Sequence, residues 1–312
     1  MTDYGHELQF GVFLTPVAVQ ADDLLALARA ADAVGLDLVT VQDHPYQARF
    51  LDTWTLLSVI AAQTARVRVA PNVANLPLRP PVVLARSVAS LDILSGGRVE
   101  LGIGAGYFWD AIAAAGGTRL TPGESVDALA EAIDIIRAVW EGRASPIQHD
   151  GERYRVVGAD SGPAPAHAVE IWVGALKPRM LALTGAKADG WLPSLVNAGV
   201  DELPAMNAAI DVADERAGRS PRDIRRMYNI SGSFGRSPGL LQGQPREWAE
   251  QLAEITLVHG ISTYILPVAS AEELERFAQE VAPAVRELVD AARDGQSTTE
   301  SNQRDVDGGP VA

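Results

Sequence analysis

The sequence contains no cysteine, so disulfides, thiolate metal sites and a cysteine nucleophile are all excluded. Lysine is almost as rare, because Lys177 and Lys187 are the only two among 312 residues. The 40 acidic residues exceed the 26 basic ones, and the formal net charge of −14 would repel nucleic acid phosphates and anionic lipid. Nucleic acid and membrane surfaces are therefore not expected partners.

Long apolar runs are also absent. None approaches the length of a membrane-spanning helix, and residues 1–7 lack the basic and apolar blocks of a signal peptide. A cytoplasmic location is the simplest interpretation. Hydrophobic residues make up 47% of the chain, which is enough for a large core, and barrels of this length commonly form one domain.

Short apolar runs alternate with longer amphipathic runs along the chain, and eight such pairs follow one another. The short runs contain few polar residues, as is typical of parallel strands that are buried on both faces. The pattern predicts a single (β/α)8 TIM barrel over residues 1–292, with an open doubly wound sheet as the alternative. The predicted strands are residues 8–14, 37–42, 67–73, 98–103, 170–174, 190–193, 224–233 and 262–267.

Three stretches fall outside this repeat. Residues 143–169, after the fourth helix, contain Asp150-Gly151 between two short segments of strand character, which predicts a hairpin. Residues 235–245, after the seventh strand, are placed to form either a mobile lid or a passive surface loop. Residues 293–312 are polar and without periodicity, so we expect a disordered C-terminal tail.

The active site of such a barrel lies at the carboxyl ends of its strands. His44, directly after Asp43, is the only histidine at a predicted strand end. A group that titrates near neutrality beside aromatic residues suits proton transfer next to a planar cofactor, and Asp43 could orient its ring. The alternative is that both side chains only stabilise the loop. The other four histidines lie elsewhere, and no second ligand stands at metal-binding spacing, so no metal site is expected.

The third and fourth strands end in asparagine and glycine residues. Asn72 could hydrogen-bond a heterocycle or could simply form a turn. Gly104 and Gly106 would allow the backbone to approach a flat ring, and turn formation is the alternative here too. A dinucleotide-binding fingerprint is rejected, because its third glycine would be needed where Tyr107 stands.

The fifth strand runs through Gly174 into a helix that begins at Pro178. Free amides and the positive end of the helix dipole at such a junction favour the binding of an anion. The segment of residues 173–180 is therefore the strongest candidate for a phosphate site. A glycine turn with incidental basic residues is the alternative.

Taken together, these segments resemble the luciferase-like monooxygenase superfamily, especially its actinobacterial oxidoreductases that use the deazaflavin F420 or FMN. The resemblance covers about residues 8–290. Its most specific part is the run Leu94-Ser95-Gly96-Gly97-Arg98, which leads into Gly-Ile-Gly-Ala-Gly at residues 102–106. Residues 10–14, 41–46, 75–81, 171–175 and 188–191 also match.

The resemblance implies a flavin or deazaflavin ring that lies across the mouth of the barrel. It implies that Asn72-Val73 forms a non-proline cis peptide against the ring, and that His44 is the best candidate for a proton donor or acceptor. The cofactor contacts that it implies are Leu14, Asp43, His44, Asn72 and Val73 for the ring, and Gly174, Ala175 and Leu176 for the phosphate. Gly104 and Gly106 are added as candidate ring contacts because glycine there lets the backbone approach a flat ring.

One position departs from part of the superfamily. Its sugar-phosphate dehydrogenases carry an acidic residue where this chain has Tyr107, so a sugar phosphate is not the expected substrate. Aromatic residues near the predicted site indicate a small, largely apolar or planar organic substrate, although some of these rings belong to the core. The candidate substrate contacts are Tyr46, Tyr107, Phe108 and Trp109.

We therefore expect an oxidoreductase that uses F420, the preferred cofactor, or FMN. It would act as an F420H2-dependent reductase or dehydrogenase, or as an FMNH2-dependent monooxygenase. The alternatives are a non-catalytic flavin-binding or partner subunit of the same fold, and a cofactor-free lyase or isomerase. A homodimer is expected, because the family usually pairs barrels through helices two and three, and residues 56–62 are largely apolar.

Overall fold

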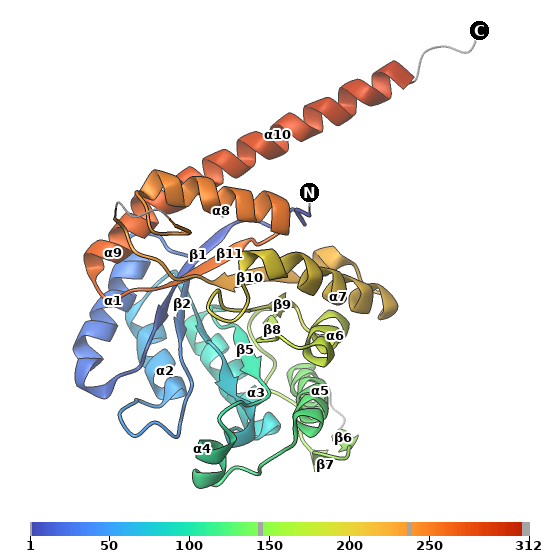
Figure 1. Ribbon diagram of the computed structural model, residues 1–312. Helices are drawn as coiled ribbons and strands as arrows, with labels where there is room; N and C mark the ends of the chain where they lie inside the picture. Colours follow the sequence, from blue (N-terminus) through green and yellow to red (C-terminus); the bar gives the residue numbers. More distant parts are fainter. Residues whose placement is uncertain (1, 143–145, 236–238, 308–312) are drawn as a thin grey trace.

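The computed structural model describes residues 2–142, 146–235 and 239–307, and of residues 296–307 it describes the backbone alone. In these residues nine parallel strands form one sheet, and the helices lie outside it (Figure 1). The sheet order is β3-β2-β1-β11-β10-β9-β8-β5-β4. The strands are β1 (Gln9–Leu14), β2 (Leu38–Val41), β3 (Arg68–Pro71), β4 (Ala74–Asn75), β5 (Leu101–Gly104), β8 (Ile171–Val173), β9 (Gly190–Trp191), β10 (Arg225–Asn229) and β11 (Thr263–Pro267).

The sheet forms a nearly closed barrel because β3 and β4 are two parts of the predicted third strand. They are separated at Asn72-Val73, whose peptide bond is cis, as the resemblance implies. Strand β3 pairs with β2, whereas β4 pairs with β5, and a parallel bridge between Val69 and Val99 joins the two ends of the sheet. Counted as one strand, β3 and β4 complete the predicted (β/α)8 barrel. The open-sheet alternative is wrong.

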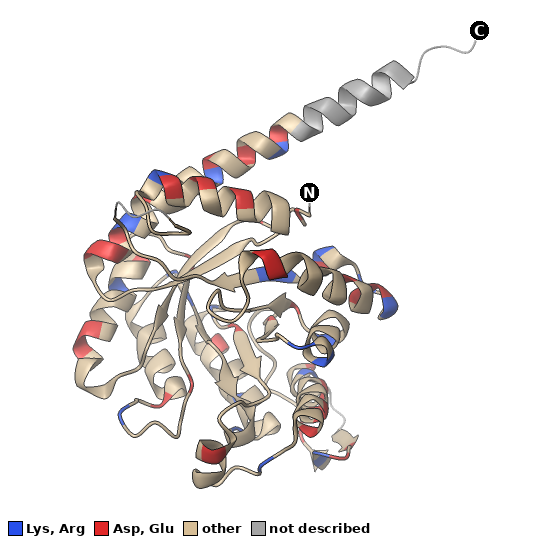
Figure 2. Cartoon of the chain, in the orientation of Figure 1, with Lys and Arg blue, Asp and Glu red and all other residues tan. Residues whose placement is uncertain are grey.

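Helices follow the strands in the expected alternation. Most of the charged residues belong to helices and loops, and few lie on the strands (Figure 2). The longer helices are α1 (Ala21–Ala33), α2 (Thr53–Gln63), α3 (Pro81–Ser95), α5 (Pro122–Trp140), α6 (Pro178–Lys187), α7 (Leu203–Arg216), α8 (Pro245–His259) and α10 (Ala282–Asp307). The short helices α4 (Trp109–Ala114) and α9 (Ala271–Arg276) lie beside the barrel mouth and before α10 respectively. None of the described helices is long and apolar enough to cross a membrane.

The core has two layers, because successive side chains of a strand point to opposite faces. One layer packs between the strands and the surrounding helices, and it includes Phe10, Val12 and Leu14 of β1. The other layer fills the barrel itself, against which Phe13 and Val73 also pack. Its buried members are Leu38, Ala70, Trp172, Leu192, Met227 and Ile265. The barrel is therefore a packed scaffold that is open only at its mouth.

The insertion after helix α5 contains the predicted hairpin. Strands β6 (Ile147–Asp150) and β7 (Arg155–Ala159) pair antiparallel around the turn at Gly151. The Glu131 carboxylate of α5 accepts hydrogen bonds from the backbone amides of residues 152–154 and so ties the turn to the barrel. Of the segment 235–245, residues 236–238 lie outside the described part of the chain. The backbone of its remainder is tied back by hydrogen bonds from Ser233 to Leu241 and from Gly235 to Gly243.

The end of the chain differs from the expectation. Helix α10 continues to Asp307, so residues 293–307 are helical where the sequence analysis places a tail without regular structure. Val285 and Val289 in the preceding turns of α10 are buried and anchor the helix on the barrel. Once the helix is formed there, the polar residues that follow can continue it into solvent. The division into a barrel domain of residues 1–292 and a separate tail stays a prediction.

Candidate active site

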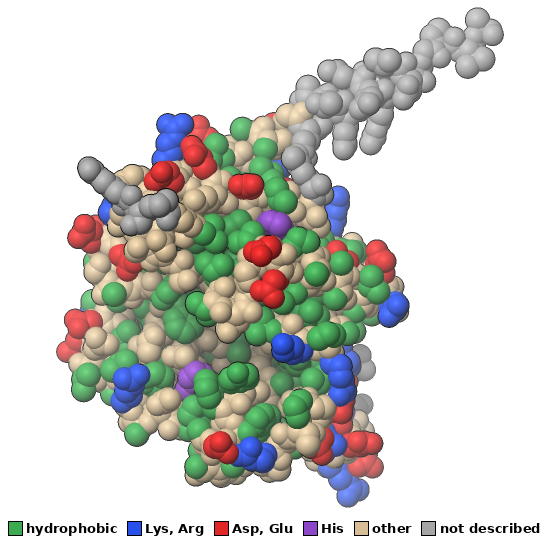
Figure 3. Space-filling view, viewed as in Figure 1, with side chains coloured by type: hydrophobic (Ala, Val, Ile, Leu, Met, Phe, Trp, Pro, Cys, Tyr) green, Lys and Arg blue, Asp and Glu red, His purple; other side chains and the backbone are tan. Residues whose placement is uncertain are grey.

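A cavity of about 1090 Å³ lies at the carboxyl ends of the strands. Figure 3 shows a hollow in the middle of the face that is turned to the viewer, with hydrophobic side chains gathered around it. Its size suits a tricyclic cofactor together with a small substrate. The cavity brings together most of the residues that the sequence analysis selects, namely Asp43, His44, Tyr46, Asn72, Val73, Gly104, Gly106, Tyr107, Phe108, Trp109, Gly174, Ala175 and Leu176.

Leu14 is the exception, and its neighbour Phe13 lines the cavity in its place. The side chain of Leu14 is 1% exposed and packs in the layer between strands and helices. Side chains alternate along a strand, so neighbouring residues such as Phe13 and Leu14 point to opposite faces, one into the barrel and one toward the helices. The structure therefore places Phe13 at the cavity, and Leu14 behind it.

His44 lies in a cluster of aromatic rings. Its ring stacks on Tyr46 with 5.3 Å between ring centroids, and Phe108 approaches edge-on at 5.5 Å. Burial lowers the pKa of His44, and the negative charge of Asp43 opposes this effect. Among the described residues its ring nitrogens have no hydrogen-bond partner. His44 therefore presents a mainly neutral imidazole that is free to take a proton from a molecule in the cavity.

Asp43 does not orient His44, which corrects that expectation. Its carboxylate accepts hydrogen bonds from Nε and Nη2 of Arg79 and from the backbone amide of Asn75. Arg79 in turn donates to Asp52, which caps the N-terminus of α2. A buried carboxylate satisfied in this way fixes the loop between β2 and α2 and leaves the adjacent histidine to the cavity.

Two asparagine amides meet across the barrel mouth. Asn72 donates from Nδ2 to Oδ1 of Asn229 over 2.7 Å, and Asn229 donates to Asn72 over 3.2 Å and to Ser194 Oγ over 3.2 Å. The pair links the ends of β3 and β10. Asn72 is therefore held in place by protein groups, while its neighbour Val73 carries an apolar side chain into the cavity.

Glycines provide room for Val73. A Cβ atom at Gly104 would lie 2.7 Å from Val73 Cγ2, so an alanine there would collide with it. Gly106 has a φ of 96°, and a side chain at this position would also meet Pro77 and Trp109. The absence of side chains at Gly104 and Gly106 thus gives the cavity wall its shape. The sequence analysis predicts a related role for them, in which the backbone comes close to a flat ring.

The junction between β8 and α6 has the features of an anion site. Lys177 is the N-cap residue and makes no side-chain capping bond, and Pro178 occupies the first turn of the helix. The backbone amides of Ala175, Leu176 and Lys177 have no hydrogen-bond partner within the described chain. The Lys177 side chain is exposed and forms no ion pair among these residues. Free amides, a helix N-terminus and a nearby ammonium group together favour a phosphate.

Several residues that line or support the cavity were not selected from the sequence. Arg79 stands within one of the matching segments, but nothing in its surroundings indicates that it pairs with Asp43. Ser194 directly follows the sixth predicted strand, so the strand-end rule could have selected it. Asn229 lies within the seventh predicted strand, and only the structure shows that β10 ends there. Asn75 also lies just after a predicted strand, the third. Pro122 and Gly123, at the start of α5, also line the cavity.

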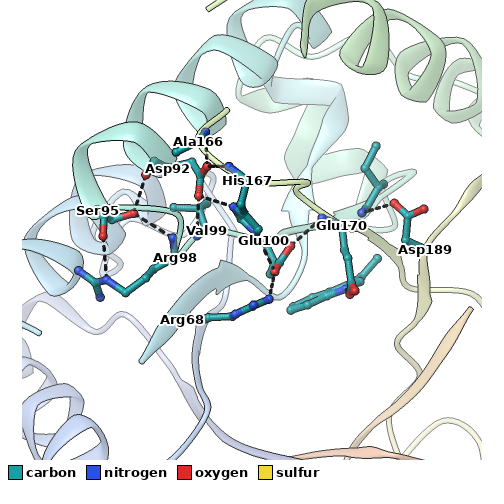
Figure 4. Close-up of polar contacts among 12 residues, drawn as sticks. Arg68, Asp92, Ser95, Arg98, Val99, Glu100, Ala166, His167, Glu170 and Asp189 are labelled. Atoms are coloured by element: carbon teal, nitrogen blue, oxygen red, sulfur yellow. Dashed lines mark hydrogen bonds and ion pairs between the residues drawn. The ribbon is translucent and has the colours of Figure 1, made fainter. Parts of the chain in front are cut away.

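A second polar cluster lies at the opposite end of the barrel, at the amino ends of β3, β5 and β8 (Figure 4). His167 contacts Oδ1 of Asp92 at 2.9 Å and Oε1 of Glu100 at 3.2 Å, and Glu100 also pairs with Arg68. The hydrogen bond to Glu100, with that to Asp92, raises the pKa of His167 to about 8. These groups satisfy one another and lie away from the cavity, so they serve the fold.

The fold and the site define a class of protein, a (β/α)8 barrel with a cofactor-sized cavity at the carboxyl ends of its strands. Residues 5–301 match the family described as luciferase-like monooxygenase, and the chain belongs to this family. The F420-dependent glucose-6-phosphate dehydrogenase of Kribbella flavida is 29% identical over 267 residues, which cover 83% of this chain and 77% of that protein.

Two solved structures share the fold. The coenzyme F420-dependent tetrahydromethanopterin reductase of Methanopyrus kandleri has a TM-score of 0.76 at 19% identity, covering 89% of this chain and 99% of that one. The oxygenating constituent of 3,6-diketocamphane monooxygenase from Pseudomonas putida, solved with FMN, has a TM-score of 0.74 at 19% identity, with coverages of 89% and 99%. Both likenesses concern the barrel and its architecture.

Proposed function

We propose that this protein is an oxidoreductase that binds F420, or alternatively FMN, in the cavity and acts on a small, largely apolar organic molecule. The observation that carries the proposal is the union of three features in one cavity. They are the amides of Ala175 and Leu176 and the imidazole of His44, none of which has a hydrogen-bond partner in the described part of the chain, and the wall formed by Val73. The F420-dependent relatives and the FMN-containing neighbour support these two cofactors.

The residues present fit such a cofactor. A phosphate group finds the amides at the start of α6, and Gly174 leaves open the space beside them, since a Cβ there would meet nothing closer than 3.7 Å. A flat ring would lie against Val73, near Asn72 and Gly104. The bound reduced cofactor supplies hydride, or the electrons for activating oxygen.

His44 is proposed to move the proton that accompanies this chemistry. Its lowered pKa keeps the ring neutral near neutral pH, so that it can accept a proton from a substrate hydroxyl or return it to a carbonyl oxygen. Tyr46, whose pKa burial raises to about 12, stacks on the imidazole and remains protonated. The aromatic cluster thus orients His44 and adds no second charged group beside the imidazole.

The substrate is proposed to lie against Tyr46, Tyr107, Phe108 and Trp109. Tyr107 is 82% exposed at the rim of the cavity, where an acidic residue would be needed for the sugar-phosphate activity of the relatives. Asp43, the acidic residue that lines this part, is neutralised by Arg79. A neutral apolar or planar molecule therefore fits this wall better than an anion does.

We also propose that the protein is a cytoplasmic homodimer. Val83, Ile93 and Leu94 of α3 and Val59 of α2 are exposed apolar side chains on two neighbouring helices, which supports pairing through this face.

The proposal is tested by titrating the purified protein with F420 and with FMN and following ring fluorescence. Saturable binding of at least one cofactor is expected. Neutral ketones, or aromatic compounds together with oxygen, should then oxidise the reduced form, or neutral alcohols should reduce the oxidised form. If neither cofactor binds at micromolar concentration, the proposed function is wrong.

A further inference from the structure

Gln42 presents an uncharged polar side chain to the cavity. The residue directly follows β2 and is half-buried, and it lines the cavity two positions before His44. Its side-chain amide has no hydrogen-bond partner among the described residues. The amides of Asn72 and Asn229 differ in this respect, because they bind each other. The amide of Gln42 is therefore available to a molecule in the cavity.

The backbone of Gln42 is held on both sides. Its N–H group donates to the carbonyl oxygen of Leu14 over 3.2 Å, and its own carbonyl oxygen accepts from Oγ1 of Thr53 over 2.6 Å. Side chains alternate along a strand, and the preceding Val41 is buried in the layer between strands and helices. The direction of β2 thus turns Gln42 to the barrel interior, before any ligand binds.

The charges around the cavity decide which kind of group suits Gln42. Of the described residues that line the cavity, Asp43, Lys177 and Arg179 carry a formal charge at neutral pH. Lys177 and Arg179 belong to the junction at the start of α6, and Asp43 is neutralised by Arg79. These residues leave no unpaired charge at the end of β2, so a neutral group fits this place better than an ion does.

The chemistry of a primary amide suits both forms of an alcohol and ketone pair. Its nitrogen can donate to a carbonyl oxygen, and its oxygen can accept from a hydroxyl group. The amide does not titrate, whereas the nearby imidazole of His44 takes up or releases a proton. Gln42 can therefore hold an oxygen atom in place while His44 changes its charge.

We infer that Gln42 is a specificity-determining residue, whose side-chain amide hydrogen-bonds the hydroxyl or carbonyl oxygen of a planar, otherwise apolar substrate. The inference rests on the proposed function, because this oxygen is the atom with which His44 exchanges the proton. It narrows the substrate class from apolar or planar molecules to those that carry a neutral oxygen function.

The test is equilibrium dialysis of the purified protein, with and without saturating FMN or F420, against three planar probes of similar size. Naphthalene has no oxygen, 2-naphthol has a hydroxyl group and 2-tetralone has a carbonyl group. Gln42→Met keeps the length of the side chain and removes its polar atoms. Its dissociation constants for 2-naphthol and 2-tetralone are expected to rise about tenfold, the loss of one hydrogen bond, while that for naphthalene stays the same.

Gln47→Met is the matched control, since Gln47 lies in the same loop but is exposed and does not line the cavity. All three of its dissociation constants should equal those of the wild type. Gln42→Glu serves if the methionine variant does not fold. A carboxylate accepts from a hydroxyl group but repels a carbonyl oxygen, so 2-tetralone alone should then bind more weakly.

A merely structural glutamine would change the binding of all three probes alike or of none, and either result would overturn the inference. A wild type that binds neither oxygen-bearing probe would overturn it as well. If cofactor binds normally, these outcomes leave the proposed function standing. A wild type that binds neither cofactor would overturn the proposed function, and dialysis without cofactor would still report on Gln42.

Discussion

Arg79 holds the carboxylate of Asp43 with two hydrogen bonds, from Nε to Oδ2 and from Nη2 to Oδ1, each 2.7 Å long. Asp43 is 1% exposed, so its charge depends on this partner. The same carboxylate accepts from the backbone of Asn75. One ion pair therefore fixes both the loop that carries His44 and the strand that carries Asn75.

Arg79→Gln should destabilise the protein by about 3 kcal/mol, because it leaves a buried carboxylate without its cation. Urea denaturation measures the loss as a lower midpoint. Arg119→Gln is the control, since Arg119 pairs with Asp110 on the exposed surface and should change stability by less than about 0.5 kcal/mol. Equal midpoints for wild type and Arg79→Gln would contradict the role given to this pair.

His44→Ala or His44→Asn should lower turnover about a hundredfold or more, as expected for loss of an acid–base group, with a much smaller effect on cofactor affinity. Single-turnover oxidation of the reduced cofactor by substrate measures the chemical step. His149→Asn, on the hairpin outside the cavity, should keep the wild-type rate. If His44 only shapes the loop, its variants will lose affinity or stability and retain the rate at saturation.

Gly174→Asp should abolish cofactor binding and leave the fold intact. A carboxylate would then stand beside the amides that receive the phosphate, and charge repulsion would add to the steric effect. Gly174→Ala is the matched control, because its Cβ would have only ordinary contacts, the nearest at 3.7 Å, and it should bind cofactor far more tightly than the aspartate variant. Cofactor affinity that survives the aspartate would move the phosphate site elsewhere.

The His167 cluster predicts a stability change in mildly alkaline solution. The folded protein raises the pKa of His167 to about 8, above its ordinary value of 6.5, so charged His167 stabilises the fold. This contribution is complete below a pH of about 6.5 and is lost as the pH rises through about 8. His167→Gln should therefore be less stable than wild type at low pH, and the difference should shrink above pH 8.

Denaturation midpoints of both proteins across this range measure the effect, and His149→Gln controls for the loss of a histidine elsewhere. A constant difference between wild type and His167→Gln at every pH would show that His167 acts without its charge.

Leu94→Asp should convert the proposed homodimer into a monomer. Leu94 is 83% exposed on α3, and a charge there would be desolvated in an interface. Light scattering at micromolar concentration gives the mass directly. Val157→Asp, on exposed strand β7, should keep the mass of the wild type. A wild-type protein that is itself monomeric under these conditions would refute the dimer.

Much of the site could be predicted from the sequence because parallel strands in a barrel all end at the same edge. His44, Asn72, Gly104 and Gly174 each lie at or just after the carboxyl end of a strand, so the order of strands was sufficient to bring them together. Local signals also sufficed for the hairpin, where Asp150-Gly151 forms the turn.

Other features depend on which face of an element is turned inward. In the run of residues 8–14 both Phe13 and Leu14 are apolar, so the pattern cannot tell the barrel interior from the helix-covered outside. Only the register between β1 and its neighbours decides that Phe13 reaches the cavity. The extent of α10 is a similar case, because its polar residues suit a helix and a coil alike.

The sequence by itself determined the barrel, the family and the strand ends that line the cavity, since these follow from periodicity and from short local motifs. Only the tertiary structure decided the partners of the polar groups. Asp43 and Arg79 are 36 positions apart and Asn72 and Asn229 are 157 apart, and no local pattern relates them. Such pairings arise when the barrel closes, because closure brings groups from distant strands within hydrogen-bond distance.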